Sequence, residues 1–174
     1  TCNGFGSVIP NPCRECAGDG RVRARQTINI KIPAGVETGN RIQMSGRGEV
    51  GPGGGPAGDL YVEIVERAHE YLVREGDNLH IQIGISMAHA ALGTHVQIEG
   101  IDGTLDVDIK AGTQSGSTIV LKGKGVTHLR STSRGDLIVH VEVQTPVKLN
   151  REQEELLQKF ADARGEKDGE IHLS

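Results

Sequence analysis

The sequence feature that most constrains the fold is an internal repeat with a fixed offset of 77 residues. The stretch "INIKIPAGVETGNRIQMSGRGEV", which starts at Ile28, aligns with "LDVDIKAGTQSGSTIVLKGKGVT", which starts at Leu105. The same offset carries "GDLYVEI" from Gly58 onto "GDLIVHV" from Gly135 without a net insertion. Because glycines and apolar residues keep their spacing over both stretches, we expect two copies of one structural unit.

Both copies show the alternation of apolar and polar residues that is typical of half-buried β-strands. Ile28, Ile30 and Ile32 alternate with polar residues, and positions 105–109 repeat this pattern. A period of two predicts strands with one buried face, and the glycines between them predict turns. Further strands are expected at 42–44, 60–64, 79–85, 95–101, 119–121 and 137–141. The predicted fold class is mainly β, with two tandem antiparallel β-sandwich-like domains.

One longer helix is predicted near the end of the sequence. Asn150 can cap it together with Gln153 at the third helical position, and Gly165 ends it. A narrow apolar stripe on this helix consists of Leu156, Leu157 and Phe160. Such a stripe can pack against the second copy or reach a partner chain. A shorter helical turn is expected over the alanine-rich positions 87–92.

Three cysteines lie close to the start of the sequence. Cys2 stands in C-x-G-x-G, and Cys13 and Cys16 stand in C-x-x-C-x-G-x-G. Tight glycine turns let two thiolates converge on one ion, so zinc binding is favoured. The alternative is a redox-active C-x-x-C, which needs a strand before it and a helix after it. Here Pro10 and Pro12 precede the pair and glycines follow it.

Composition argues against several classes of function. The net charge is −4, and only four aromatic side chains are available to stack on bases, so nucleic-acid binding is disfavoured. No apolar run reaches the length of a membrane span, and a cytoplasmic protein is expected. Asp59 and Asp136 occupy equivalent positions after a glycine, which indicates a role in turns. No nucleophile, base and acid assemble in the sequence, so we do not expect an enzyme.

Taken together, these motifs resemble the C-terminal part of the bacterial DnaJ co-chaperones. The resemblance rests on the cysteine units and on the stretches "IPAGVETGNRI", "REGDNLHIQIGISMAHAALG" and "LKGKGV". The stretch "GPGGGPAGDLYVE" is similar to the sequences of actinobacterial members. The His-Pro-Asp J-domain that stimulates the partner ATPase is not in this sequence. The resemblance implies four parts: the end of a cysteine-rich zinc module at 1–22, the remainder of a first peptide-binding β-domain at 23–72, a second β-domain at 73–148, and a helix with the start of a dimerisation segment at 149–174.

The resemblance also implies a function. Members of this family bind unfolded polypeptides in an apolar groove of the first β-domain by strand addition, prevent aggregation, and deliver the clients to a DnaK-type chaperone. Ile28 and Val62 match positions of that groove, and both also fit an ordinary sheet core. The family forms homodimers through the segment that follows the second β-domain. The alternative function is a thiol-disulfide oxidoreductase that uses Cys13 and Cys16.

Zinc is the cofactor that the resemblance implies. In this family four cysteine units form two zinc sites, and Cys13 and Cys16 look like the fourth unit while Cys2 looks like part of the third. Their partners would all lie upstream of Thr1. We therefore expect zinc in the full-length parent protein and no tightly held zinc in this chain.

Overall fold

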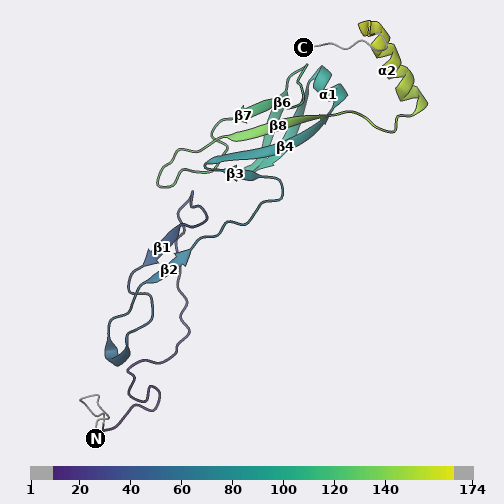
Figure 1. The fold of residues 1–174 in the computed structure, drawn as a ribbon. Helices are drawn as coiled ribbons and strands as arrows, with labels where there is room; N and C mark the ends of the chain where they lie inside the picture. Colours follow the sequence, from purple (N-terminus) through teal and green to yellow (C-terminus); the bar gives the residue numbers. More distant parts are fainter. Residues whose placement is uncertain (1–9, 167–174) are drawn as a thin grey trace. The chain divides into compact units, whose positions relative to one another are not determined.

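The computed structural model describes residues 10–166, and the chain divides into two compact units (Figure 1). Unit 1 extends to Glu70 and includes the segment Val126–Arg134. Unit 2 comprises Tyr71–Gly125 and the chain from Gly135 onward. Strands dominate both units, in agreement with the mainly β fold class expected from the sequence.

Unit 1 contains a two-stranded antiparallel ribbon. Strand β1 (Arg41–Met44) pairs with β2 (Leu60–Glu63), and Ile42 faces Val62 across the pair. The glycine-rich connection between the strands contains a 3₁₀ turn, η1 (Pro52–Gly54). Apolar residues alternate with polar or exposed ones on both strands, which gives the ribbon one apolar face.

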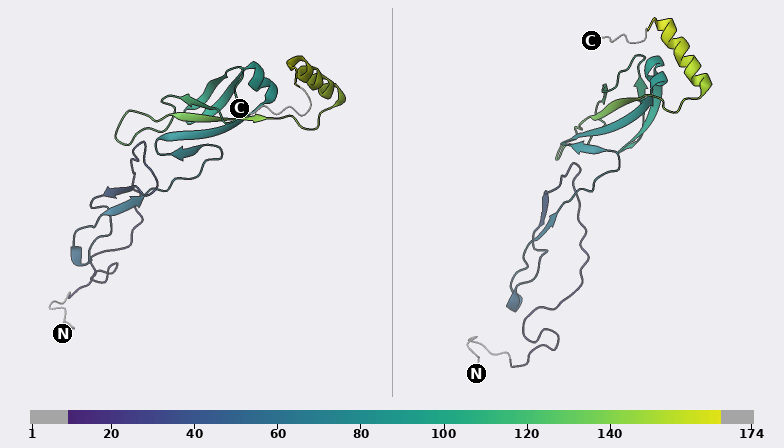
Figure 2. Two further views of the ribbon diagram at one scale, coloured as in Figure 1. Left: turned by 45° about the horizontal axis from the view of Figure 1, so that its top comes forward. Right: turned by 45° about the vertical axis from the view of Figure 1, so that its right-hand side comes forward.

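Unit 2 contains a four-stranded sheet and a separate hairpin. Its elements are β3 (Val73–Glu75), β4 (Asn78–Ser86), α1 (Met87–Leu92), β5 (Thr94–Gly100), β6 (Gly103–Ile109), β7 (Thr118–Leu121), β8 (Leu137–Gln144) and α2 (Arg151–Arg164). The sheet has the order β3-β4-β8-β7, and β5 pairs with β6. Figure 2 shows these strands from two further directions. The central pair β4–β8 is parallel, whereas the other strand pairs of the described chain are antiparallel.

The hydrophobic core lies in unit 2. The buried apolar residues are Leu72, Leu79, Ile81, Ile85, Ala90, Ile98, Val107, Ile109, Leu137, Val139 and Val141. They come from both the sheet and the hairpin, so these two layers bury apolar surface together. Among the described residues of unit 1, by contrast, no hydrophobic side chain is buried.

The repeat predicted from the sequence is confirmed at the level of strand register. Ile42 faces Val62 in the β1–β2 pair, and 77 residues later Ile119 faces Val139 in the β7–β8 pair. The same offset relates two isolated bridges, Val50–Ala57 and Thr127–Arg134. The shared spacing of turns and apolar residues therefore encodes the same local pairing in both copies.

Asp59 and Asp136 act in turns, as their positions in the repeat indicated. The amide of Gly46 donates to Asp59 Oδ1 at 2.9 Å, and that of Gly123 donates to Asp136 Oδ1 at 2.8 Å. Both glycines have a positive φ, near 67–68°, which an L-residue rarely adopts. Each carboxylate thus satisfies a backbone amide where the chain reverses.

One expected strand is not formed. Residues 26–32 are extended but belong to no ladder, although their repeat counterparts form β6. Strand β6 is held by β5, and the positions 77 residues before β5 are 17–23, which follow Cys16 in turns and irregular structure. Alternation therefore predicted an extended segment here, but in the described chain the positions equivalent to its partner strand follow the cysteine motif and form no strand.

Helix α2 has the ends that the sequence predicted. Asn150 accepts from the Gln153 amide at 2.9 Å, and the Gln153 side chain accepts from the Asn150 amide at 2.9 Å. Gly165 ends the helix in the left-handed conformation, with φ of 73°. Within residues 10–166, no helix combines the length and apolar character that a membrane crossing requires.

Candidate functional site

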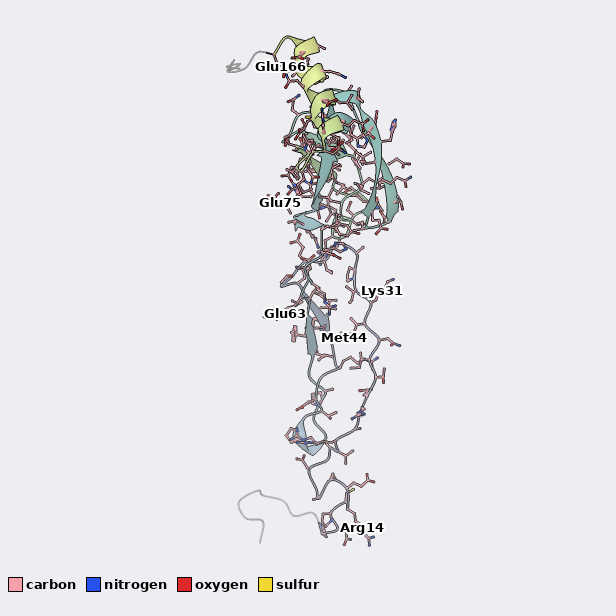
Figure 3. The ribbon with its side chains drawn as sticks, turned by 90° about the vertical axis from the view of Figure 1, so that its right-hand side faces the viewer. Arg14, Lys31, Met44, Glu63, Glu75 and Glu166 are labelled. Carbon is pink, nitrogen blue, oxygen red and sulfur yellow. The ribbon has the colours of Figure 1, made fainter. Side chains whose placement is uncertain are left out.

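The apolar face of the β1–β2 ribbon carries half-buried side chains. Its members are Ile42, Met44, Leu60 and Val62. The opposite face carries Arg41, Gln43, Tyr61 and Glu63, all of which are exposed. Figure 3, in which Met44 and Glu63 are labelled, shows side chains leaving both faces of the ribbon. Because the four apolar side chains are only partly covered, unit 1 presents an accessible hydrophobic strip.

Because the chain contains a repeat, the exposure of these side chains can be compared with that of their counterparts in unit 2. Val62 is half-buried, whereas its counterpart Val139 has 0% of its surface exposed. Leu60 differs from Leu137 in the same way. Strand β8 is flanked by β4 and β7, but β2 has β1 as its only partner among the described residues. The second edge of β2 and the apolar side chains on this strand are therefore less covered than those of β8, whereas Ile42 and Met44 are half-buried like their counterparts on β7.

Ile28 lies on a different segment from Val62, within the same unit. It is half-buried in the extended stretch 21–33, which runs along the length of the ribbon in each view (Figures 1 to 3; Lys31 is labelled in Figure 3). In the described structure, no hydrogen bond joins residues 26–32 to β1 or β2. Ile28 and Val62 thus belong to two neighbouring segments of unit 1 that no strand ladder links.

Sequence reasoning did not include Ile42, Met44 and Leu60 among the candidate site residues. The sequence nevertheless contains a pattern that could have identified them, because these residues share the period-two alternation of Val62. What the sequence could not show is their exposure. The equivalent side chains of β8 in the second copy are covered by tertiary packing, and nothing in the local pattern distinguishes the two copies.

Cys13 and Cys16 form a compact knuckle. The amide of Ala17 donates to the Cys13 carbonyl and that of Asp19 to the Cys16 carbonyl, both at 2.8 Å. Hydrogen bonds from the backbone amides of Cys16 and Glu15, and then from the Cys16 thiol, lower the pKa of the exposed Cys13 thiol. Donors directed at a sulfur stabilise the thiolate, which is the form that binds a metal ion.

The knuckle is anchored to the glycine-rich connection between β1 and β2. The Gly53 amide donates to the Asp19 carbonyl at 3.0 Å, and Arg21 Nη1 donates to the Val50 carbonyl at 3.3 Å. A Cβ atom at Gly20 would lie 3.1 Å from the Gly54 nitrogen, so the two backbones approach closely. These contacts place the cysteine pair at one end of unit 1, a role that the sequence did not assign to Asp19 or Arg21.

The knuckle fits part of a tetrahedral zinc site. Two neighbouring thiols, of which Cys13 accepts hydrogen bonds at its sulfur, match two of the four ligands that structural zinc requires. Over residues 10–166, no group of three or more His, Cys, Asp or Glu side chains is arranged to hold a metal ion. Cys2 lies outside the described residues. The described chain therefore supplies two thiol ligands.

Comparison with known proteins connects this architecture with one family. A family profile described as "DnaJ C terminal domain" matches residues 9–146. A protein of Streptomyces avermitilis named "Chaperone protein DnaJ 2" is 62% identical over 165 residues, which cover 95% of this chain and 44% of that protein. A protein of Mycobacterium tuberculosis with the same name is 54% identical over 172 residues, covering 98% of this chain and 44% of the relative. The chain thus spans less than half the length of these curated relatives.

Proposed function

Because this chain belongs to the DnaJ C-terminal domain family, we propose that it binds unfolded or misfolded polypeptide segments on the apolar face of unit 1. One observation carries the proposal. Val62 and Leu60 remain partly exposed on β2, whereas their repeat counterparts on β8, Val139 and Leu137, are completely buried. A partly covered apolar strip next to a free strand edge is suited to an extended segment that offers hydrophobic side chains.

Strand addition explains how such a site recognises many sequences. The second edge of β2 can supply backbone donors and acceptors to an extended client, and these groups do not depend on the client's side chains. The apolar face then selects hydrophobic residues at alternate client positions. Ile28 borders this site from the extended segment, and Val62 lies at its centre.

The wider role follows from the family. We propose that the full-length protein prevents aggregation and delivers clients to a DnaK-type chaperone in the cytoplasm, and that it works as a homodimer. Cys13 and Cys16, and Cys2 with them, would contribute ligands to zinc sites that are completed by residues outside this chain. The division into parts at 1–22, 23–72, 73–148 and 149–174 belongs to the same proposal.

A thiol-disulfide oxidoreductase is not the function that we propose. The lowered pKa of Cys13 would serve a nucleophile, but it serves a metal ligand equally well. The relatives are named as chaperones, and the client-binding proposal explains the exposed apolar ribbon, which thiol chemistry does not.

The proposal is tested by fluorescence-polarisation binding of an unstructured apolar peptide to the 174-residue chain and to two variants. Val62→Ser removes an apolar side chain from the proposed site and should weaken binding about tenfold, which corresponds to the loss of one buried aliphatic group. Tyr61→Ser is the matched control, since Tyr61 lies on the same strand, is 59% exposed and faces the other side. Ile28→Ser should weaken binding less than Val62→Ser.

Circular dichroism establishes that each variant is folded before binding is compared. Equal affinities for the unmodified chain and the Val62→Ser variant would exclude the apolar face as the client site. A larger loss for Tyr61→Ser than for Val62→Ser would place the site on the opposite face of the ribbon.

A further inference from the structure

Three titratable side chains form a hydrogen-bonded chain across the sheet of unit 2. Glu75 ends β3, His80 lies on β4 and His140 lies on β8. Glu75 Oε2 is 3.1 Å from His80 Nε2, and His80 Nδ1 is 3.0 Å from His140 Nε2. The two histidines are 60 residues apart in sequence and meet because β4 and β8 are parallel neighbours.

The two imidazole rings meet edge to edge. Their planes differ by 17° and their centroids are 5.3 Å apart, yet the facing nitrogens are only 3.0 Å apart. The shortest approach is therefore through these nitrogens and within nearly parallel planes. One nitrogen must carry a proton and the other must offer a lone pair, so at least one imidazole of the pair is neutral.

The carboxylate determines which nitrogens carry the protons. Ionised Glu75 can only accept, so His80 Nε2 must donate to it. When His80 is neutral, its Nδ1 is then an acceptor, and His140 Nε2 must donate to that atom. Both neutral histidines are thus in the Nε2–H form. One added proton keeps this hydrogen bond: when it binds to His140 Nδ1, the Nε2 proton of His140 can pass to His80 Nδ1, which then donates to His140 Nε2. The positive charge then lies on His80, beside Glu75.

Few charged groups on the surrounding strands share this face with the pair. Glu142, on the same face of β8, is a carboxylate and accepts a hydrogen bond from Gln82 at 2.7 Å. The β7 residue opposite His140 is the uncharged Thr118. On β3, Arg74 pairs with Leu79 on the core face, and its Nε donates to the Gly76 carbonyl at 2.7 Å. Helix α1 begins seven positions beyond His80, at the far end of β4.

We propose that Glu75, His80 and His140 form a proton-sensitive clasp across β3, β4 and β8. The clasp is closed while at least one imidazole is neutral. When both are protonated, two N–H donors and two positive charges face each other at hydrogen-bond distance, and the contact becomes repulsive. The side chain of His80 is only 23% exposed, so solvent screens this repulsion incompletely.

Opening the clasp acts on the β4–β8 pair, because the repulsive contact joins His80 of β4 to His140 of β8. A protonated His80 keeps its contact with Glu75, so β3 stays attached to β4. The unfolded chain accepts the second proton that the closed clasp resists, so added acid weakens the β4–β8 pair. This pair forms the centre of the sheet of unit 2.

The first test reads the tautomers directly in the unmodified chain. Long-range ¹H–¹⁵N spectra at pH 7.5 should show His80 and His140 in the Nε2–H form. A neutral His80 protonated on Nδ1 would contradict the arrangement and overturn the proposal. His95 provides a comparison, because its side chain is 83% exposed although it lies 3.4 Å from Asp108.

The second test is amide hydrogen exchange of β4 and β8 in the full chain at pH 7.5 and pH 5.0, corrected for intrinsic rates. Protection in the unmodified chain should fall about tenfold at the lower pH, the scale expected when a hydrogen bond to a charged group is lost. In His140→Gln the amide nitrogen can still donate to His80 Nδ1 but cannot gain a proton, so protection should change little. His95→Gln should behave like the unmodified chain.

An equal acid response in the unmodified chain and in His140→Gln would overturn the proposal. His140→Ala, which removes the donor, should lower protection already at pH 7.5. If His140→Gln does not fold, the tautomer spectra of the unmodified chain still decide the question.

Discussion

At the scale of single residues, Asp59 shows how a turn in this protein depends on one carboxylate. Its Oδ1 accepts from the Gly46 amide at 2.9 Å and its Oδ2 accepts from Gln43 Nε2 at 2.6 Å. The Gly46 amide, and then the Gln43 side chain, lower the pKa of Asp59. Both contacts favour the ionised form, so the turn is best held when the carboxylate is charged.

We predict that Asp59→Ala removes the exchange protection of the Gly46 amide at neutral pH. Since the folded-state pKa of Asp59 lies below its ordinary value of 3.8, the carboxylate stabilises the turn above that value. This contribution is lost as the pH falls from 3.8 through the folded-state pKa. The difference between the unmodified chain and the variant, followed by hydrogen exchange, should therefore disappear in strong acid.

Asp136→Ala is the matched variant in the second copy and should deprotect Gly123 in the same way, because Gly123 donates to Asp136 at 2.8 Å. If Gly46 keeps its protection at neutral pH without the Asp59 carboxylate, the turn is held by its backbone alone.

At the scale of elements, the stability of α2 depends on the capping interactions at its ends more than on packing against other residues. None of its side chains is buried, and Leu156 and Phe160 are 58% and 54% exposed. Leu156 and Leu157 line a shallow hollow together with Met87 and Ala88 of α1 and with Leu149. Part of the apolar stripe thus packs against the rest of unit 2. Phe160 lies instead near Arg164, whose guanidinium is 5.8 Å from the ring centre.

We predict that Asn150→Ala lowers the helicity of α2 and speeds its amide exchange, with a loss of about 1 kcal/mol in helix stability. The substitution removes the acceptor of the Gln153 amide, which has no other partner in the first turn. Lys159→Ala is the control, because it keeps both caps and a residue with high helix propensity. Equal exchange rates in the two variants would mean that tertiary contacts, and not the cap, hold α2.

At the scale of the whole molecule, the two units differ in how much apolar surface they bury. The buried hydrophobic residues of the described chain all belong to unit 2, although both copies carry nearly the same apolar pattern. Burial of apolar side chains is the main source of folding stability. Unit 1 should therefore be the less stable unit.

We predict that amides of the β1–β2 pair exchange at least about tenfold faster than their counterparts in β7–β8. The repeat makes the comparison direct, since Ile42 and Val62 can be measured against Ile119 and Val139 in the same register. Denaturant should then produce an early transition for unit 1 and a later one for unit 2. Matching protection at the paired positions would show that the two units unfold as one.

The residues by themselves determined the local structure of this protein. The 77-residue repeat, the turn aspartates and the capping box of α2 could all be read from the sequence. The capping box joins residues three positions apart, and the turn aspartates could be found because the sequence contains two copies to compare. The family could be recognised for a related reason, since its motifs are short and keep their order along the chain. Ile28 and Val62 could be named as candidates from those motifs, and their role remains a prediction.

Only the tertiary structure decided which copy is covered and which strands pair. The same alternation gives a buried Val139 and a half-exposed Val62, because β4 lies beside β8 while β2 has one partner in the described chain. The parallel β4–β8 pairing, which brings His80 to His140, is likewise invisible to local pattern. Period-two alternation specifies a strand with one apolar face. Which strand lies next to it depends on distant parts of the chain, and that neighbour decides whether the apolar face is shielded from water.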